Sequence, residues 1–288
     1  WTVMVGEVLM RAGSEAQKKT LLPKIAAGDL IATPAWMEPS AQWSAHGITA
    51  SALQSGTDFT LDGEKLFVND GHIADCLLVA ARTSGSGEDG VTLFALDRQR
   101  AGITVTPLKT MDQTRKLAAV KLTGVKAAAA DVVGEVGKGW QPFSQALDRA
   151  KVMLAAEMMG GAQKVLEVTT EYAKVRVQFG RPIGSFQAVQ HKCANMLIDV
   201  ESAKSAVYYA AWAVSNEVAD APLAAALAKA AASDAFRRVS ADGIQVHGGI
   251  GFTWDHDLHL YFKRAKSSEF TFGDATYNRE LVAQGINL

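Results

Sequence analysis

The segment from Ile31 to about Val136 constrains the fold of this 288-residue chain most, because it holds short strand-like runs and no long helical pattern. These runs are TDFTLDGEKLFV (57–68), CLLVAA (76–81), VTLFAL (91–96) and ITVTP (103–107). Strands that follow one another without intervening helices predict an antiparallel sheet, folded as a barrel or sandwich, and not a βαβ domain. Within the first run, Asp62-Gly63 predicts a two-residue hairpin turn.

Helical patterns flank this β-segment on both sides. Residues 1–28 predict short helices, one of them started by a capping box in which Ser14 precedes Gln17 by three positions. After the β-segment, residues 186–216 repeat apolar positions with a period of about 3.6. An Ala-rich helical stretch follows and ends near Gly248-Gly249, so we predict an antiparallel helical bundle.

The change of pattern along the chain predicts an α+β fold in three regions. Residues 1–28 form a helical segment, 29–137 a β-domain and 138–288 a four-helix bundle. The first segment is too short to bury both sides of a helical layer, and the chain opens with Trp1 in place of Met. We therefore expect a truncated helical domain at the N-terminus, of which only the final part is present.

Composition excludes several classes of protein. The chain has 29 Lys and Arg residues against 30 Asp and Glu residues, a formal net charge of -1, which gives no basis for binding nucleic acid or an anionic membrane. No apolar run approaches the roughly 20 residues that span a bilayer. Two cysteines are too few for a disulfide framework, so we expect a cytoplasmic protein.

Two segments suit phosphate binding. In RVQFGRPIGSFQAVQ (176–190), Arg176 and Arg181 flank Phe179-Gly180 next to a helix start, where guanidinium groups and amide dipoles bind phosphates. The alternative is a helix corner with two solvated arginines, and the residues alone leave both open. In QVHGGIGF (245–252), the glycines allow close approach of a ligand, but the segment follows a helix and is not a Rossmann motif.

A polar cluster, Asp255, His256, Asp257 and His259, is the one candidate for a metal site. No further ligand lies nearby in sequence, so we expect a solvated or interfacial helix end and no metal. The chain also lacks a GxSxG elbow, and neither cysteine has a neighbouring histidine, so hydrolase chemistry has no support.

The order of the three regions and their motifs resembles the acyl-CoA dehydrogenase family of flavoproteins. The motifs that carry the resemblance are RxxFGRPIGxFQxxQ from Arg176, QxxGGxGF from Gln245, Gln17 to Pro23, Glu38-Pro39, Gly63-Glu64-Lys65, Gly134 to Trp140, and Lys263 to Lys266. The resemblance implies FAD bound between subunits and oxidation of the Cα–Cβ bond of an acyl-CoA thioester, as in lipid β-oxidation. It further implies an oligomer, a dimer of dimers with FAD shared across an interface.

The resemblance assigns cofactor-binding roles to residues that match the family's motifs. These are Arg176, Phe179, Gln187, Gln245, Gly248, Gly249 and Asn69. In the family a glutamate removes the α-proton of the substrate, either from a Y-E-G-T motif or from the first bundle helix. Here the corresponding positions are Phe272 and Ala150, and neither side chain can accept a proton.

The loop that faces the subunit's own flavin also departs from the family pattern. Gln42 and Trp43 replace small residues, and Asn69 replaces a hydroxyl-bearing residue, whereas the residues that reach a neighbouring subunit's FAD are intact. The leading hypothesis is therefore a subunit of a heteromer that lacks its own base and completes its partner's FAD site. In this respect the chain resembles subunits of the heteromeric family members that act in actinobacterial steroid side-chain degradation.

Two other hypotheses remain open. The first is a self-sufficient homo-oligomeric dehydrogenase with a displaced base, for which Asp274 is the first candidate and Asp148 and Glu157 are others. Asp274 could equally cap a following helix. The second is a structural scaffold that uses the fold without FAD.

Overall fold

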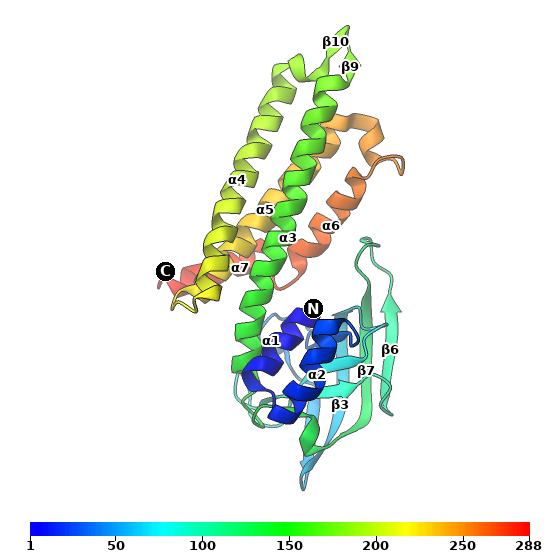
Figure 1. Cartoon of the computed structure of the whole chain (residues 1–288), viewed down its shortest axis with the longest axis vertical. Coiled ribbons are helices and arrows are strands. Elements are labelled where there is room, and N and C mark those ends of the chain that lie inside the picture. Colours follow the sequence, from blue (N-terminus) through cyan, green and yellow to red (C-terminus); the bar gives the residue numbers. More distant parts are fainter. The chain divides into compact units, whose positions relative to one another are not determined.

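In the computed structural model all 288 residues are described, and the chain divides into two compact units, Trp1–Ala150 and Lys151–Leu288 (Figure 1). The helices are α1 (Thr2–Ala12), α2 (Glu15–Ala27), α3 (Trp140–Val175), α4 (Gln187–Ser215), α5 (Ala221–His247), α6 (Leu258–Phe270) and α7 (Ala275–Gly285). The main strands are β1 (Ala32–Ala35), β2 (Ser51–Ser55), β3 (Asp58–Asn69), β4 (Cys76–Arg82), β5 (Val91–Asp97), β6 (Ile103–Leu108), β7 (Leu117–Ala127) and β8 (Val132–Val133). No helix is long and apolar enough to cross a membrane.

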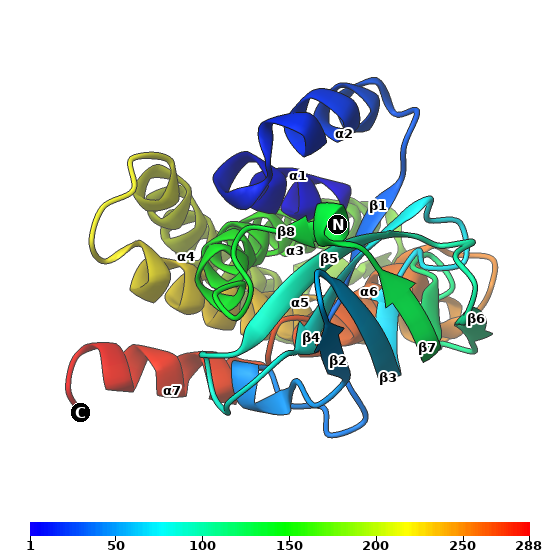
Figure 2. The same ribbon diagram turned by 90° about the horizontal axis from the view of Figure 1, so that it is seen from below.

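The first unit begins with α1 and α2, which lie together beside the sheet (Figure 2). The predicted capping box is present: the Ser14 hydroxyl accepts from the Gln17 N–H, and the Gln17 side chain accepts from the Ser14 N–H. Gly28 ends α2 in the left-handed conformation at φ 81°. Because glycine adopts this conformation without a Cβ penalty, local sequence sets both ends of α2.

The β-segment forms one eight-stranded sheet in the order β6-β7-β3-β2-β4-β5-β8, with β1 beside β4. Most pairs are antiparallel, as predicted, but β4 pairs in parallel with β1, where Ala32 lies opposite Cys76, and with β2, where Ser51 lies opposite Arg82. Strands β3, β4, β5 and β7 bury apolar side chains on one face, where Phe59 and Phe94 meet edge to face at 5.2 Å. The predicted β-domain with an antiparallel sheet is confirmed.

The predicted hairpin turn at Asp62-Gly63 is wrong. These residues lie inside β3, where its register with β7 shifts, and the turn between β2 and β3 falls at Gly56-Thr57. A Cβ on Gly63 would come within 2.5 Å of the Ala50 Cβ. Glycine is therefore required at this position by the close approach of another segment and not by a turn.

The second unit is helical, as predicted. Helices α4 and α5 run antiparallel after a short connection, and the predicted stripe of α4 is buried, including Met196, Val200 and Val207. Arg238 holds Asp199 with two hydrogen bonds of 2.9 and 2.7 Å, and Lys192 pairs with Asp242, so charges join the same two helices. The Ala-rich face of α5 allows close packing of its neighbours.

Candidate functional site

The Arg176 segment forms a small hairpin at one end of the helical unit. Strands β9 (Val177–Gln178) and β10 (Arg181–Pro182) pair, and the two residues between them, Phe179 and Gly180, have φ of 54° and 79°. Positive φ at both central residues is the geometry of a type I′ turn. It leaves the Phe179 ring 90% exposed, while the Arg181 guanidinium lies 4.2 Å above the Phe186 ring.

The second phosphate-binding candidate lies at the same end of the unit. The Tyr172 ring, one turn before Arg176 on α3, stacks on His247 at the end of α5, with ring centroids 4.1 Å apart. Gln245 is exposed, and so are Gly248 and Gly249, which follow α5 directly. The fold therefore brings together the two segments that the sequence analysis singled out.

The glycines of this end leave the backbone open to a ligand. Gly248 has φ 63° and ψ -139°, a conformation that only glycine adopts without strain. A Cβ built on Gly248 or Gly249 would meet no heavy atom within 4 Å. Closely packed neighbours therefore do not explain these two glycines, and the space above them is free.

An orphaned polar atom adds to this fit. Burial lowers the pKa of His247, so its ring is neutral at neutral pH, and Nδ1 lies 2.8 Å from the Gly243 carbonyl, to which it donates. Nε2 is then a buried acceptor, and it has no hydrogen-bond partner. An exposed arginine, an open glycine backbone, an exposed aromatic ring and an unpaired acceptor fit the pyrophosphate, ribose and adenine of FAD. Gln187, the exposed first residue of α4, begins the helix that follows the hairpin.

Asn69 ends β3 in the first unit. Its side chain is buried, and Oδ1 has no hydrogen-bond partner, while the backbone carbonyl accepts from the Thr33 hydroxyl at 2.6 Å. Phe67 and Asp70 on either side have positive φ, and the register with β7 shifts here. A buried unpaired acceptor at a distorted strand end is suited to an N–H donor of a bound ring such as isoalloxazine.

Neither expected base position holds a carboxylate. Phe272 is 6% exposed and follows α6, and Ala150 is 7% exposed on α3. Asp274, the first candidate for a displaced base, caps α7: its Oδ1 accepts from the Tyr277 N–H at 2.7 Å. Glu157 accepts from Arg264 at 2.8 Å, and Asp148 is partly buried on α3. The Asp274 and Glu157 carboxylates thus each have a structural partner.

The polar cluster around His256 belongs to the start of α6. His256 Nδ1 accepts from the Leu258 N–H at 3.2 Å, and the His259 ring packs edge-on against Trp254 at 4.5 Å. Lys263 lies over the same indole at 4.3 Å. The structure contains no group of three or more His, Cys, Asp or Glu side chains arranged to hold a metal ion.

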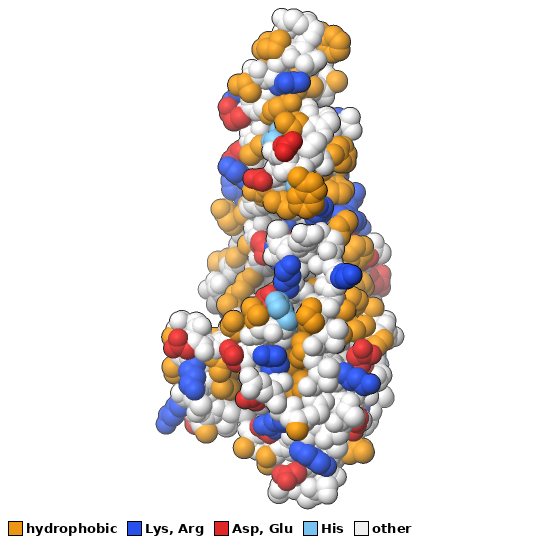
Figure 3. All heavy atoms as spheres, turned by 90° about the vertical axis from the view of Figure 1, so that its right-hand side faces the viewer, with side chains coloured by type: hydrophobic (Ala, Val, Ile, Leu, Met, Phe, Trp, Pro, Cys, Tyr) orange, Lys and Arg blue, Asp and Glu red, His pale blue; other side chains and the backbone are white.

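The full burial of two lysines was not predicted from the sequence. Lys65 lies in β3 and contacts Glu38 Oε1 at 2.5 Å, and Lys229 lies in the Ala-rich part of α5. Both are 0% exposed, and burial lowers the pKa of Lys65 to about 8 and that of Lys229 to about 7. For Lys229, the one available signal was its position among alanines that all face the core. On the face seen in Figure 3, by contrast, positive and negative side chains are interspersed.

Comparison with known proteins gives consistent matches along the chain. Residues 137–287 match the family described as acyl-CoA dehydrogenase, C-terminal domain, and residues 34–125 match the acyl-CoA dehydrogenase middle domain. The chain is 32% identical over 279 residues to the probable acyl-CoA dehydrogenase YngJ of Bacillus subtilis, covering 95% of this chain and 73% of that protein. It is 39% identical over 224 residues to acyl-CoA dehydrogenase IpdE2 of Mycobacterium tuberculosis, covering 78% of this chain and 58% of that protein.

A solved structure extends the match to nearly the whole chain. The ChsE4-ChsE5 complex from Mycobacterium tuberculosis superposes with a TM-score of 0.89 at 31% identity, covering 99% of this chain and 74% of that chain.

Proposed function

The chain belongs to the acyl-CoA dehydrogenase family, and we propose that it works as one subunit of a heteromeric dehydrogenase. The family assignment confirms the resemblance seen in the sequence, with FAD as the cofactor. The similarity to the ChsE4-ChsE5 complex supports a heteromer. Because the sequence resembles heteromeric members of steroid side-chain degradation, the proposed substrate class is a bulky acyl-CoA thioester.

The observation that carries this proposal is the apolar side chain at position 272. Dehydrogenation requires a base within reach of the substrate's α-proton, and a buried phenyl ring cannot act as one. Ala150 offers no replacement. In the proposed assembly the partner subunit supplies the glutamate, and this chain contributes no proton acceptor at either position.

The contribution of this chain is the exposed end of its helical unit. Arg176 and the backbone of Gly248 and Gly249 would hold the pyrophosphate of an FAD bound mainly by the partner, and Phe179 and Gln245 would contact its adenosine. When bound, FAD would accept the hydride that leaves the β-carbon of the substrate. Asn69 would offer its unpaired amide oxygen to the ring of a flavin on this chain's own side.

Reconstitution tests the proposal. The chain is purified alone and with candidate family partners, and flavin absorbance and acyl-CoA oxidation are recorded for each. We expect turnover only in the complex, and Arg176→Ala to lower the FAD content of the complex. Stoichiometric FAD and turnover from the chain alone would refute the heteromer.

A gain-of-function variant tests the missing base separately. Phe272→Glu returns a carboxylate to the position that the family uses, and Phe272→Gln is the matched control of similar size without a proton acceptor. We expect acyl-CoA oxidation in the complex to increase with Phe272→Glu only. Equal activities of the two variants would show that position 272 does not limit the reaction.

A further inference from the structure

Position 272 lies in the turn between α6 and α7, residues Thr271–Asp274, here named the α6–α7 turn. Phe272 has φ 61° and Gly273 has φ 91°, so two successive residues are left-handed. A residue with a Cβ is strained in this conformation and keeps it only where the surroundings determine the backbone. Groups outside the turn must therefore hold it.

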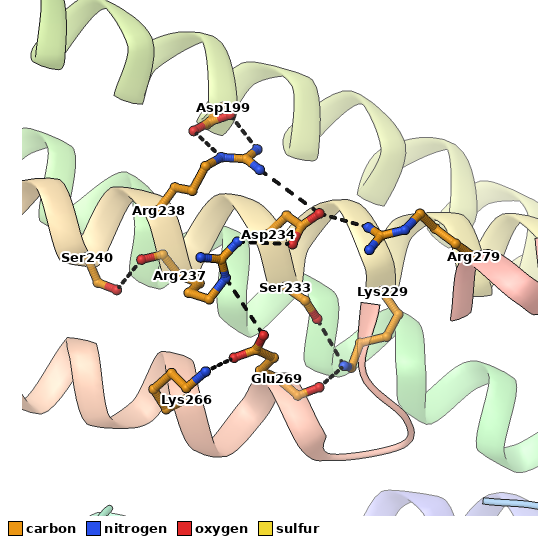
Figure 4. Close-up of polar contacts among 10 residues, drawn as sticks. All are labelled: Asp199, Lys229, Ser233, Asp234, Arg237, Arg238, Ser240, Lys266, Glu269 and Arg279. Carbon is orange, nitrogen blue, oxygen red and sulfur yellow. Dashed lines mark hydrogen bonds and ion pairs between the residues drawn. The ribbon is translucent and has the colours of Figure 1, made fainter. Parts of the chain in front are cut away.

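Lys229 of α5 is one of these groups. Its Nζ donates to the Glu269 carbonyl and to the Ser233 hydroxyl, both at 3.0 Å (Figure 4), and also to the Gly273 carbonyl at 2.8 Å. These three acceptors use all three N–H groups of the ammonium. Two of them are main-chain carbonyls, one in the last turn of α6 and one in the α6–α7 turn, so a single side chain fixes both sides of position 272.

Asn278 of α7 holds the turn from the other side. Its side chain is fully buried, and Nδ2 lies 3.0 Å from the Gly273 carbonyl and 2.9 Å from the Asp274 carbonyl. Arg279, next to it, donates to Asp234 of α5 at 2.8 Å, which ties the start of α7 to the helix that carries Lys229 (Figure 4).

A buried ammonium costs free energy that an apolar side chain in the same place would not. Lys229 is surrounded in sequence by alanines, so an apolar side chain at this position would pack in the helical unit as well as the lysine does. The N–H donors of the lysine determine where the Gly273 carbonyl lies. They thereby determine the backbone conformation of Phe272, the residue before it.

We propose that Lys229 is a positioning residue for position 272, fixing the α6–α7 turn so that the side chain there projects in one direction. The inference goes beyond the proposed function and does not depend on it. The contacts are made to the backbone, so they hold whether residue 272 is phenylalanine or glutamate.

Single-site fluorine NMR tests this directly. 4-Fluorophenylalanine is placed at position 272 of the full chain, and its resonance is compared between wild type and Lys229→Met. We expect the resonance to shift or broaden in Lys229→Met. It should stay unchanged in Ser233→Ala, which leaves both main-chain contacts of the lysine in place. Glu38→Gln/Lys65→Met is the matched control, since it removes a second fully buried lysine from the other unit together with its ionic partner.

An unchanged resonance in folded Lys229→Met, or the same change in Glu38→Gln/Lys65→Met, would overturn the proposal. If Lys229→Met does not fold, hydrogen exchange of the wild-type chain tests the proposal instead. The amides of Tyr277 and Asn278, both bonded to Asp274, should exchange at least roughly tenfold more slowly than those of Ile286 and Asn287 at the end of α7. Equal exchange rates would show that the turn is not held.

Discussion

Glu38→Gln is expected to destabilise the first unit strongly. Glu38 accepts from Lys65 Nζ at 2.5 Å, from the Thr49 N–H and hydroxyl at 2.9 and 2.5 Å, and from the Ala50 N–H at 3.0 Å. The Lys65 side chain is fully buried. Thr49 donates to Oε2, whereas Ala50 and Lys65 donate to Oε1, so the single oxygen of glutamine can keep only one of these sets. The variant therefore removes the charge that compensates the buried ammonium together with part of the hydrogen bonding.

Removing one partner of a buried ion pair costs about 3–5 kcal/mol, because the other charge stays buried without compensation. A domain is stable by only about 5–15 kcal/mol, so this loss is a large share of the free energy of unfolding. Replacing both partners by groups of similar volume is often neutral. The double variant Glu38→Gln/Lys65→Met should therefore recover more than half of the loss.

The pKa values of Lys65 and Glu38 determine how the stability loss of Glu38→Gln should depend on pH. Burial lowers the pKa of Lys65 from 10.5 to about 8, although Glu38 acts to raise it. Burial would raise the pKa of Glu38, but Lys65 and the hydrogen bonds outweigh this and lower it. Without Glu38, the pKa of Lys65 falls further. The deficit of Glu38→Gln relative to wild type is then largest below the pKa of Lys65 in the variant and narrows as the pH rises to about 8. Above that pH it stays constant, because the lysine is neutral in both folded proteins.

Urea unfolding at pH 7 and pH 9, followed by circular dichroism and tryptophan fluorescence, measures the three free energies. The reasoning is refuted if Glu38→Gln loses less than about 1 kcal/mol at pH 7, the range of an exposed pair. It is also refuted if the double variant is less stable than the single one.

Three further predictions concern the helical unit. Because burial lowers the pKa of Lys229 to about 7, unfolding takes up a proton between pH 7 and 10.5, so stability should increase with pH above 7. Thermal unfolding of wild type and Lys229→Met checks this, and the variant should show a smaller increase, because Lys65 with its pKa of about 8 still contributes. Asp274→Asn should change the free energy of unfolding by less than about 0.5 kcal/mol and leave turnover of the complex unchanged, because asparagine caps helices as well as aspartate does. If turnover is lost while thermal unfolding stays unchanged, Asp274 is instead a displaced base. Gly248→Ala should cost about 1–3 kcal/mol in thermal unfolding and lower the FAD content of the complex, whereas Gly249→Ala, at a position without a positive φ, should leave the thermal unfolding nearly unchanged.

The helices could be predicted from sequence because their signals are local. The capping box of Ser14 and Gln17 needs only three residues of separation, and the period of α4 follows from its own side chains. The end of α5 at His247 was likewise marked by the glycine that follows it.

The errors in the β-domain come from contacts between distant segments. Asp62-Gly63 has the residues of a hairpin turn, but the glycine is there because Ala50 approaches its backbone. The parallel pairing of β1 with β4 joins segments about forty residues apart, and no alternation within either strand shows it. Counting along the chain could locate Phe272, but not Lys229, because the main acceptors of that lysine are backbone carbonyls that every residue has.

Two features of the helical unit are unfavourable for an isolated chain and are explained together by the proposed subunit role. The Phe179 ring is 90% exposed, and its edge meets the Phe186 ring at the start of α4 with centroids 6.1 Å apart, which is the arrangement of a contact residue and not of a core residue. The α6–α7 turn keeps Phe272 in a left-handed backbone conformation next to Gly273, whose carbonyl accepts from a buried ammonium. Both features cost stability, and neither supplies a base. A chain selected only to fold would gain stability by relaxing both. A subunit that presents one end of its helical unit to a partner needs the exposed Phe179 ring, and one that keeps a fixed surface at position 272 needs the strained α6–α7 turn. At both positions the direction of the side chain matters more than its contribution to stability.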